Sequence, residues 1–212
     1  MHHEGTGHGR TILLARPAAA RRERRLPLRH RGGPTMTTAL PTPGPSGRTA
    51  QWGVQYRTPR PADAPAVWRL AERTAALDPN GPQHYALWFR DFADTSLVAT
   101  LDEEVVGFVT GYRRPEAPDT YFVWQYAAVA RFALPFLDAE LFEAAADRER
   151  ARGARYVETT AGTGSQGLVT VLEQYARGRS APVRTALLFP AERFPAAHAD
   201  EVLYRIGPFP TS

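Results

Sequence analysis

VVGFVTGYRRPEAPDTYFVWQ, at positions 105–125, is the stretch of sequence that decides the fold. Apolar runs on either side of a proline-containing turn predict two strands joined as a hairpin. A further apolar run at 96–101, separated from the hairpin by the acidic turn at 102–104, predicts a third strand. The three segments predict an antiparallel meander whose last strand carries an unusual pair, Trp124 and Gln125.

Helical and strand periods follow one another along the rest of the chain. Apolar residues at helical spacing predict helices over 63–76, 85–92, 137–152 and 168–176. Short apolar runs predict strands over 55–58, 120–129, 155–160, 185–189 and 202–206. This alternation predicts an α/β protein, and by itself it allows many folds of that class.

Composition is ordinary for a globular protein and excludes several kinds of chemistry. The 212 residues, 43% of them apolar, suffice for one domain and an appendage. The chain has no cysteine, which excludes disulfides and thiolate chemistry and is consistent with a cytoplasmic protein. All 26 basic residues are arginine, which excludes a lysine base or Schiff base. No segment approaches the roughly 20 apolar residues that span a bilayer, so we expect no membrane association.

Positive charge is concentrated at the start of the chain. Residues 1–35 contain eight arginines and two glutamates, whereas the remainder contains 18 arginines and 20 acidic residues. The remainder therefore has a slight negative excess and gives no charge-based reason to expect nucleic-acid binding. Residues 1–52 show no sustained period and include a Pro/Gly/Ser/Thr-rich tract. We predict a disordered leader over 1–52, a domain over 53–212, and Met36 as the natural start.

Four segments, in order and at compatible spacing, resemble one family. They are FVTGYRRPEAPDTYFVWQ at 108–125, ARYVETT at 154–160, LFP at 188–190 and LYRIGPF at 203–209. Over residues 55–210 the chain resembles the L-2,4-diaminobutyrate acetyltransferases of ectoine biosynthesis, within the GNAT superfamily. The resemblance implies a GNAT fold, α/β (α+β), with a mixed, mostly antiparallel sheet of six to seven strands flanked by helices. It also implies a homodimer that transfers an acetyl group from acetyl-CoA to the side-chain amine of diaminobutyrate, without a metal.

An acceptor pocket for diaminobutyrate needs acids for its two amines and donors for its carboxylate. Asp78 and Asn80 match the family's LDxN motif, so we assign both to substrate binding. Glu158 is predicted to accept a proton from the amine or to anchor it, because an amine of pKa about 10.4 is mostly protonated. The alternative for Glu158 is a salt-bridged strand end. Tyr85 and Trp124 are also assigned to the substrate, with core positions as the alternative. Thr160 is assigned as well, and because Thr159 and Thr160 alternate in facing, at most one of the two should face the cleft.

The resemblance also implies which residues bind acetyl-CoA. In this superfamily the strand at 120–129 diverges from the next strand, and its free amides bind the thioester carbonyl and the pantetheine arm. The residues assigned on this basis are Gln125, Tyr126, Ala127 and Ala128. Ser165 aligns with the family's asparagine at the start of the following helix. Tyr175 lies on that helix, where a tyrosine often protonates the leaving thiolate in the superfamily, so we predict this role for it, although the family pattern has Phe there.

One segment departs from the family pattern. The family places Arg/Gln-x-x-Gly-x-Gly/Ala before the helix at 137–152, so that backbone amides surround the CoA pyrophosphate. This chain has Arg131-Phe132-Ala133-Leu134-Pro135-Phe136 there, and Pro135 has no amide to offer. Three interpretations stay open. The chain is an acetyltransferase that holds acetyl-CoA by other contacts, a degenerate paralogue that binds a diamino acid without acetylating it, or a locally altered sequence.

Two consecutive arginines in the hairpin, Arg113 and Arg114, have no assigned role. They are candidates for binding the substrate carboxylate or a cofactor phosphate. Exposure to solvent is the third alternative, and the sequence does not choose among the three.

Overall fold

One seven-stranded sheet organises the part of the chain that the computed structural model describes, namely residues 53–74, 77, 80–129, 134, 136–162, 165–193 and 199–210. The strands are β1 (Gln55–Arg57), β2 (Leu97–Leu101), β3 (Glu104–Arg114), β4 (Ala117–Ala128), β5 (Tyr156–Gly162), β6 (Val183–Phe189) and β7 (Glu201–Ile206). The helices are α2 (Ala64–Arg73), α3 (Pro82–Asp91), α4 (Leu137–Ala151) and α5 (Gln166–Gly178). Short 3-10 turns occur at Pro61–Asp63, Ala93–Thr95 and Ala191–Arg193.

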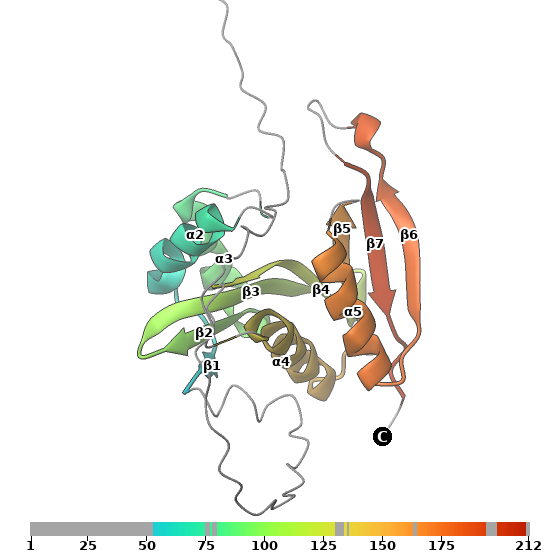
Figure 1. Cartoon of the computed structure of the whole chain (residues 1–212), viewed down its shortest axis with the longest axis horizontal. Coiled ribbons are helices and arrows are strands. Elements are labelled where there is room, and N and C mark those ends of the chain that lie inside the picture. Colours follow the sequence, from blue (N-terminus) through green and yellow to red (C-terminus); the bar gives the residue numbers. More distant parts are fainter. Residues whose placement is uncertain are drawn as a thin grey trace, which may run out of the picture.

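The strands lie in the order β1-β2-β3-β4-β5-β7-β6 (Figure 1). Neighbouring strands are antiparallel except for β4 and β5, which are parallel and are connected through α4. The hairpin of β3 and β4 thus lies at the centre of the sheet. This mixed, mostly antiparallel sheet flanked by helices confirms the predicted fold class.

Helices cover both faces of the sheet (Figure 1). On one face, α4 and α5 pack over a core that includes Val123 of β4 and Val157 of β5. On the other face, α2 and α3 pack against β2, β3 and β4 through residues such as Phe108 and Ala127. We call these the α4–α5 face and the α2–α3 face. Because side chains alternate between faces along a strand, each residue of β4 and β5 can be assigned to one of them.

Two element boundaries differ from the predicted ones for clear physical reasons. α3 begins at Pro82 rather than at the predicted Tyr85, because proline at the first helical position loses no hydrogen bond. β4 begins at Ala117 rather than at Thr120, because the hairpin pairs Ala117 with Arg114 at the end of β3. Both hairpin strands are therefore longer than their apolar runs.

Candidate active site

β4 and β5 run side by side for only a short distance before they separate. The paired residues are Thr120 with Tyr156, Tyr121 with Val157, and Phe122 with Glu158. β4 continues to Ala128 and β5 to Gly162, and within these described strands no further pairs join them. A gap therefore opens in the sheet directly beyond Phe122 and Glu158.

A β-bulge in β4 coincides with this gap. In the pairing with β3, Trp124 is an extra residue between Val123 and Gln125. A bulge bends its strand and re-aims the side chains around it. Trp124 stacks on Trp88 of α3, and Gln125 accepts a hydrogen bond from Tyr85, also of α3. Two consecutive side chains therefore point to the α2–α3 face.

Backbone N–H groups of β4 are directed toward the gap. The N–H of Gln125 donates to a threonine hydroxyl of β3 (3.1 Å), and that of Val129 donates to a carbonyl of β3 (2.8 Å). Because N–H directions alternate along a strand, those of Tyr126 and Ala128 point away from β3. β5 does not pair with β4 at that level. These amides lie where the thioester carbonyl was expected to bind, so this part of the chain fits acetyl-CoA.

Glu158 lies at the base of the gap with two arginines against it. Its side chain is 1% exposed, and its Oε2 accepts a hydrogen bond from Nη1 of Arg114 at 3.0 Å. Its Oε1 accepts one from Nη1 of Arg205, which lies directly opposite Glu158 on β7. Val157 and Ile206 pack into the α4–α5 core, so their neighbours Glu158 and Arg205 belong to the α2–α3 face.

Asn80, Tyr85 and Gln125 meet on the same face. Oε1 of Gln125 accepts hydrogen bonds from the Tyr85 hydroxyl (3.1 Å) and from Nδ2 of Asn80 (3.4 Å). Tyr85 is fully buried, and this burial raises the pKa of its phenol, so it stays a neutral donor. The side chain of Gln125, predicted to contact the cofactor, thus joins two residues predicted to contact the substrate.

Trp124 exposes an aromatic surface beside the gap. Its side chain is 49% exposed, and its ring lies 6.2 Å from that of Trp88 and 6.4 Å from that of Phe122. Phe122 is the residue of β4 that pairs with Glu158. An exposed indole and a buried carboxylate therefore lie on one face, on either side of the point where the strands separate.

Tyr175 lies in the core between α4 and α5. Its hydroxyl donates to Oδ1 of Asp147 at 2.9 Å, and its ring packs edge-on against Phe142 and Phe209. Burial, together with the negative charge of Asp147, raises the pKa of this phenol. Phe209 is bonded through its N–H to Arg155, just before β5 begins, which is the end of β5 opposite the gap. These surroundings favour the core position over the predicted thiolate protonation.

Three further predicted residues are Thr160, Ser165 and Asp78. Thr160 lies two positions beyond Glu158 on β5 and shares its face. Ser165 stands at the N-cap of α5, and its N–H donates to the Gly162 carbonyl at 3.0 Å. Asp78 lies outside the described residues.

Most of the segment that departs from the family pattern also lies outside the described residues. Two of its members are described: Leu134 is buried in the α4–α5 core, and Phe136 is exposed at the N-cap of α4. Arg113 turns to α4, where its Nε donates to Glu149 at 2.8 Å. Arg113 therefore ties the hairpin to α4, whereas Arg114 reaches the candidate site.

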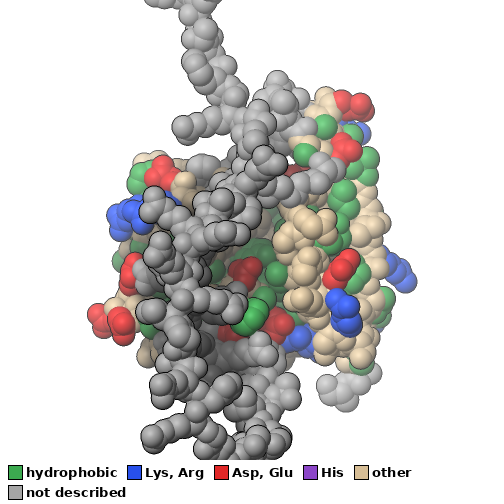
Figure 2. Space-filling model, viewed as in Figure 1, with side chains coloured by type: hydrophobic (Ala, Val, Ile, Leu, Met, Phe, Trp, Pro, Cys, Tyr) green, Lys and Arg blue, Asp and Glu red, His purple; other side chains and the backbone are tan. Residues whose placement is uncertain are grey.

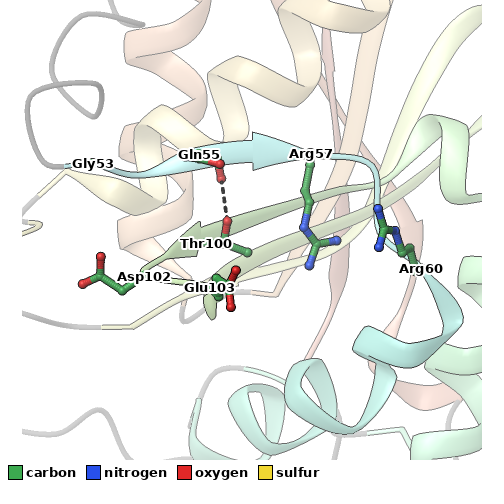
Figure 3. Close-up of a pocket in the computed structure, with 7 residues that line it drawn as sticks. All are labelled: Gly53, Gln55, Arg57, Arg60, Thr100, Asp102 and Glu103. Carbon is green, nitrogen blue, oxygen red and sulfur yellow. Dashed lines mark hydrogen bonds between the residues drawn. The ribbon is translucent and has the colours of Figure 1, made fainter.

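A hollow of about 480 Å³ lies at the β1–β2 edge of the sheet (Figure 3). Its walls come from β1 and the residues on either side of it, from β2 and from the turn after β2. The lining residues are Gly53, Gln55, Arg57, Arg60, Thr100, Asp102 and Glu103. The sheet order places β3 and β4 between this hollow and the gap. None of the predicted site residues lines it, and it mixes acidic and basic groups.

Comparison with known proteins gives a consistent result. The chain is 42% identical to the L-2,4-diaminobutyric acid acetyltransferase of Streptomyces coelicolor over 162 residues, which cover 75% of this chain and 95% of that protein. The chain belongs to the L-2,4-diaminobutyric acid acetyltransferase family. The family member from Nocardia farcinica is 38% identical over 178 residues, which cover 81% of this chain and 92% of that protein. No protein-family model matches the sequence.

Solved structures agree with this membership. Diaminobutyrate acetyltransferase EctA from Paenibacillus lautus, in complex with its substrate L-2,4-diaminobutyric acid and coenzyme A, matches with a TM-score of 0.70 at 32% identity. The match covers 75% of this chain and 97% of that one. An acetyltransferase of the GNAT family from Streptococcus pneumoniae, at 16% identity and a TM-score of 0.55, supports the fold alone. The expected family and the GNAT fold are confirmed.

Arg205 belongs to the candidate site, although no motif in the sequence assigns it there. It stands in the segment LYRIGPF, which carries part of the family resemblance. A signal was present, because the strand over 155–160 and the strand over 202–206 were both predicted, and pairing them would align Glu158 with Arg205. The order of strands in the sheet was needed to make that pairing.

Proposed function

We infer that this chain transfers an acetyl group from acetyl-CoA to the side-chain (γ) amine of L-2,4-diaminobutyrate, a step of ectoine biosynthesis. One observation carries this conclusion: in a member of this family, β4 and β5 separate directly beside the buried carboxylate of Glu158. The acetyl group and the amine can react in this gap, which each of them reaches from a different face of the sheet.

Backbone amides at the gap support the chemical step. Acetyl-CoA, when bound, supplies a thioester whose carbonyl oxygen becomes negatively charged as the amine attacks. The N–H groups of Tyr126 and Ala128 point away from β3, toward the gap, and we propose that they donate to that oxygen. Preorganised donors of this kind are worth about 10²–10³ in rate.

Glu158 is proposed to anchor a substrate ammonium rather than to accept its proton. Both oxygens of its carboxylate already accept hydrogen bonds from guanidinium groups. Each carboxylate oxygen keeps a further lone pair that can accept a hydrogen bond from an ammonium group. A general base must also pass its proton on, and the two arginines bound to Glu158 cannot accept one because they are already protonated. In this proposal the amine loses its proton to water at the open side of the gap.

Trp124, Tyr85, Asn80 and Thr160 are proposed to line the acceptor pocket. The exposed face of the Trp124 indole suits an ammonium group, because aromatic rings attract cations. Tyr85 and Asn80 orient Gln125 beside it through the two hydrogen bonds described above. Asp78 is proposed to join them on the basis of the LDxN motif alone.

Release of CoA from acetyl-CoA in the presence of L-2,4-diaminobutyrate tests the proposed function. A thiol-reactive dye reports the release without background, since the protein contains no cysteine. We expect release that depends on diaminobutyrate and saturates with it. A folded protein that gives no such release would contradict the assignment.

A catalytically degenerate paralogue is the second candidate, favoured by the segment before α4. The segment 131–136 contains no glycine, and Pro135 has no N–H, so it lacks the residues that let backbone amides surround a phosphate. In that case the protein binds diaminobutyrate but not acetyl-CoA. Calorimetric titration with CoA separates the candidates, because the enzyme must bind CoA and the paralogue need not.

We also propose that two copies of the chain associate through β6. This strand ends the sheet order, and all of its residues are exposed. Its exposed apolar side chains include Leu187 (57%) and Phe189 (44%), and hydrophobic groups gather along this outer edge of the molecule (Figure 2). An exposed apolar edge strand is a surface that a partner normally covers.

The folding unit is proposed to begin near residue 53. β1 at Gln55–Arg57 is the first strand of the described sheet. A chain lacking residues 1–52 should keep its melting temperature within a few degrees. Unfolding of that shortened chain would contradict the boundary.

The protein is proposed to act in the cytoplasm, and cell fractionation tests this location. No described helix is long and apolar enough to cross a membrane.

A further inference from the structure

We propose that Arg114 and Arg205 bind the carboxylate of the amino-acid substrate, and that Glu158, besides anchoring the ammonium group, holds both guanidinium groups in position. The identity of that substrate rests on the proposed function. The starting point is a charge imbalance at the base of the gap, where one buried carboxylate faces two guanidinium groups. The cluster carries an excess of one positive charge, which a substrate carboxylate would neutralise.

Both guanidinium groups keep most of their donors available. A guanidinium has five N–H donors. Each arginine uses its Nη1 on Glu158, and neither side chain makes another hydrogen bond to any described residue. The side chains of Arg114 and Arg205 are 39% and 30% exposed, so the unused donors reach solvent. A carboxylate is the planar anion that matches this fork of donors.

The two guanidinium groups are also held in place before any ligand binds. The guanidinium of Arg205 lies over the ring of Tyr156, 3.8 Å from its centroid, and β7 sets this arginine opposite Glu158. Arg114 follows a register shift at the end of β3, next to Arg113, which is fixed to α4. Because these side chains are already ordered, ligand binding loses less conformational entropy.

The position of the cluster favours a substrate carboxylate over a cofactor phosphate. Glu158 and Arg205 lie on the α2–α3 face, beside Phe122 and the exposed Trp124. The segment expected to meet the CoA pyrophosphate leads into α4, which covers the opposite face. An anion at the arginine pair would therefore approach from the acceptor side of the gap.

This arrangement also accounts for the choice of amine. The carboxylate and the α-amine of diaminobutyrate are attached to one carbon atom, whereas the γ-amine is two carbons further along. With the carboxylate on the arginines, the α-ammonium lies beside Glu158, and the γ-amine extends toward the gap. The arginine pair thus selects which amine is acetylated, as well as contributing to affinity.

Two ligands isolate the carboxylate contact. 1,3-Diaminopropane has the same two amines at the same spacing as L-2,4-diaminobutyrate and lacks the carboxylate. Binding of both ligands is measured by calorimetry for the wild type, Arg205→Met, Arg114→Met and Arg205→Lys. We expect each Met variant to bind diaminobutyrate about 10–100-fold more weakly, the range of a charged hydrogen bond, and diaminopropane within about twofold of wild type. Arg205→Lys should recover part of the loss.

A matched control accounts for effects on folding. Arg57 makes a similar pair with Asp63 (2.7 Å) at the far edge of the sheet, so Arg57→Met should leave both affinities unchanged. Melting temperatures show whether each variant is folded. Equal weakening of both ligands, or no weakening of either, would overturn the carboxylate site.

Product analysis by NMR gives a second readout that is separate from affinity. The wild type should form the Nγ-acetyl product, and Arg205→Met should form an increased share of the Nα-acetyl product. Arginine-dependent binding without any CoA release would leave the carboxylate site standing and remove the proposed acetyl transfer. Turnover that neither Met variant alters would keep the transfer and overturn the arginine site.

Discussion

Glu158 concentrates the electrostatics of the site in one side chain. It is almost fully buried between Arg114 and Arg205, and its carboxylate accepts a hydrogen bond from each guanidinium group. Glutamine has nearly the same shape and one acceptor oxygen, but no charge. Substitution by glutamine therefore separates the contribution of charge from that of packing.

We predict that Glu158→Gln raises the KM for diaminobutyrate about 10–100-fold, with a smaller effect on kcat. The reason is that a hydrogen bond to a charged group is worth about 1.5–3 kcal/mol, and this variant loses the charge. Steady-state CoA release measures both constants. A fall in kcat of about 10²-fold or more at unchanged KM would contradict the anchoring role and identify Glu158 as the proton acceptor.

A short motif can single out a candidate site residue, whereas a contact that depends on the sheet leaves no such signal. Glu158 and Asn80 stand in short motifs, YVETT and LDxN, and the structure brings both to the α2–α3 face. Arg205 was missed because its partner lies 47 positions away in the chain and meets it only through strand register. Gln125 is expected on the cofactor side through the free amides of its strand, but its N–H is bonded to Thr110, and beside the bulge its side chain reaches Tyr85.

At the scale of elements, β3 and β4 fit together closely just before the gap. Gly111 of β3 faces the ring of Tyr121, and a Cβ atom at Gly111 would lie 2.6 Å from two ring carbons. The ring is fully buried, and its hydroxyl donates to the Thr95 carbonyl at 2.7 Å, so it cannot move aside easily. The glycine is therefore needed for close approach.

We predict that Gly111→Ala destabilises the protein by about 1–3 kcal/mol, the usual cost of overpacking a core. Denaturant unfolding measures the change. Gly167→Ala in α5 is the matched control, because nothing lies within 4 Å of the added Cβ and alanine favours a helix. Equal stability of the Gly111→Ala variant and the wild type would show that the ring of Tyr121 adapts.

A second contact between elements joins α4 to α5 through Asp147. Its carboxylate accepts hydrogen bonds from Arg179 Nε (2.8 Å), Arg150 (2.9 Å) and the Tyr175 hydroxyl (2.9 Å). Burial alone would raise the pKa of Asp147, but Arg179, Arg150 and Tyr175 together hold it below its ordinary value. A carboxyl group whose pKa is lowered in the folded state stabilises the fold above its unfolded pKa, about 3.9, and loses this effect as the pH falls.

The pH dependence of stability tests this contact with Asp147→Asn. The wild type should be more stable than the variant at pH 7, because only the charged carboxylate pairs with Arg179. The difference should shrink as the pH falls below about 4, the pKa of the carboxyl group in the unfolded chain, and toward the lower pKa that this group has in the fold. Urea midpoints across this pH range measure it. If the stability difference between the wild type and Asp147→Asn does not change with pH, the variant is destabilised by the packing of the asparagine amide and not by the loss of charge.

The order of elements in the whole molecule was predictable, and the gap at its centre was not. Apolar runs at the right lengths predicted the seven strands and four helices that the structure describes, with boundaries shifted by a few residues. The separation of β4 from β5 depends on a bulge and on the pairing of distant strands, and neither leaves a local pattern. The resemblance to a family supplied that feature as an expectation.

At the scale of the whole molecule, the two edges of the sheet differ. β1 is a short edge strand whose three residues are Gln, Tyr and Arg. β6 at the other edge is longer and exposes Val183, Leu187, Leu188 and Phe189. A monomer with this second edge uncovered would be prone to aggregate, because its apolar side chains and the outer backbone groups of the last strand in the described sheet invite another strand.

We predict that the wild type has twice the 23.4 kDa mass of one chain in solution, and that Leu187→Arg is a monomer. Leu187 is 57% exposed on β6, so a charge there costs nothing in the separate chain but would be buried without a partner in the dimer. Light scattering after size exclusion measures the mass. Leu87→Arg is the control, because Leu87 is similarly exposed (53%) but lies on α3. A wild-type protein that is already monomeric, or a Leu187→Arg variant that stays dimeric, would contradict an interface at β6.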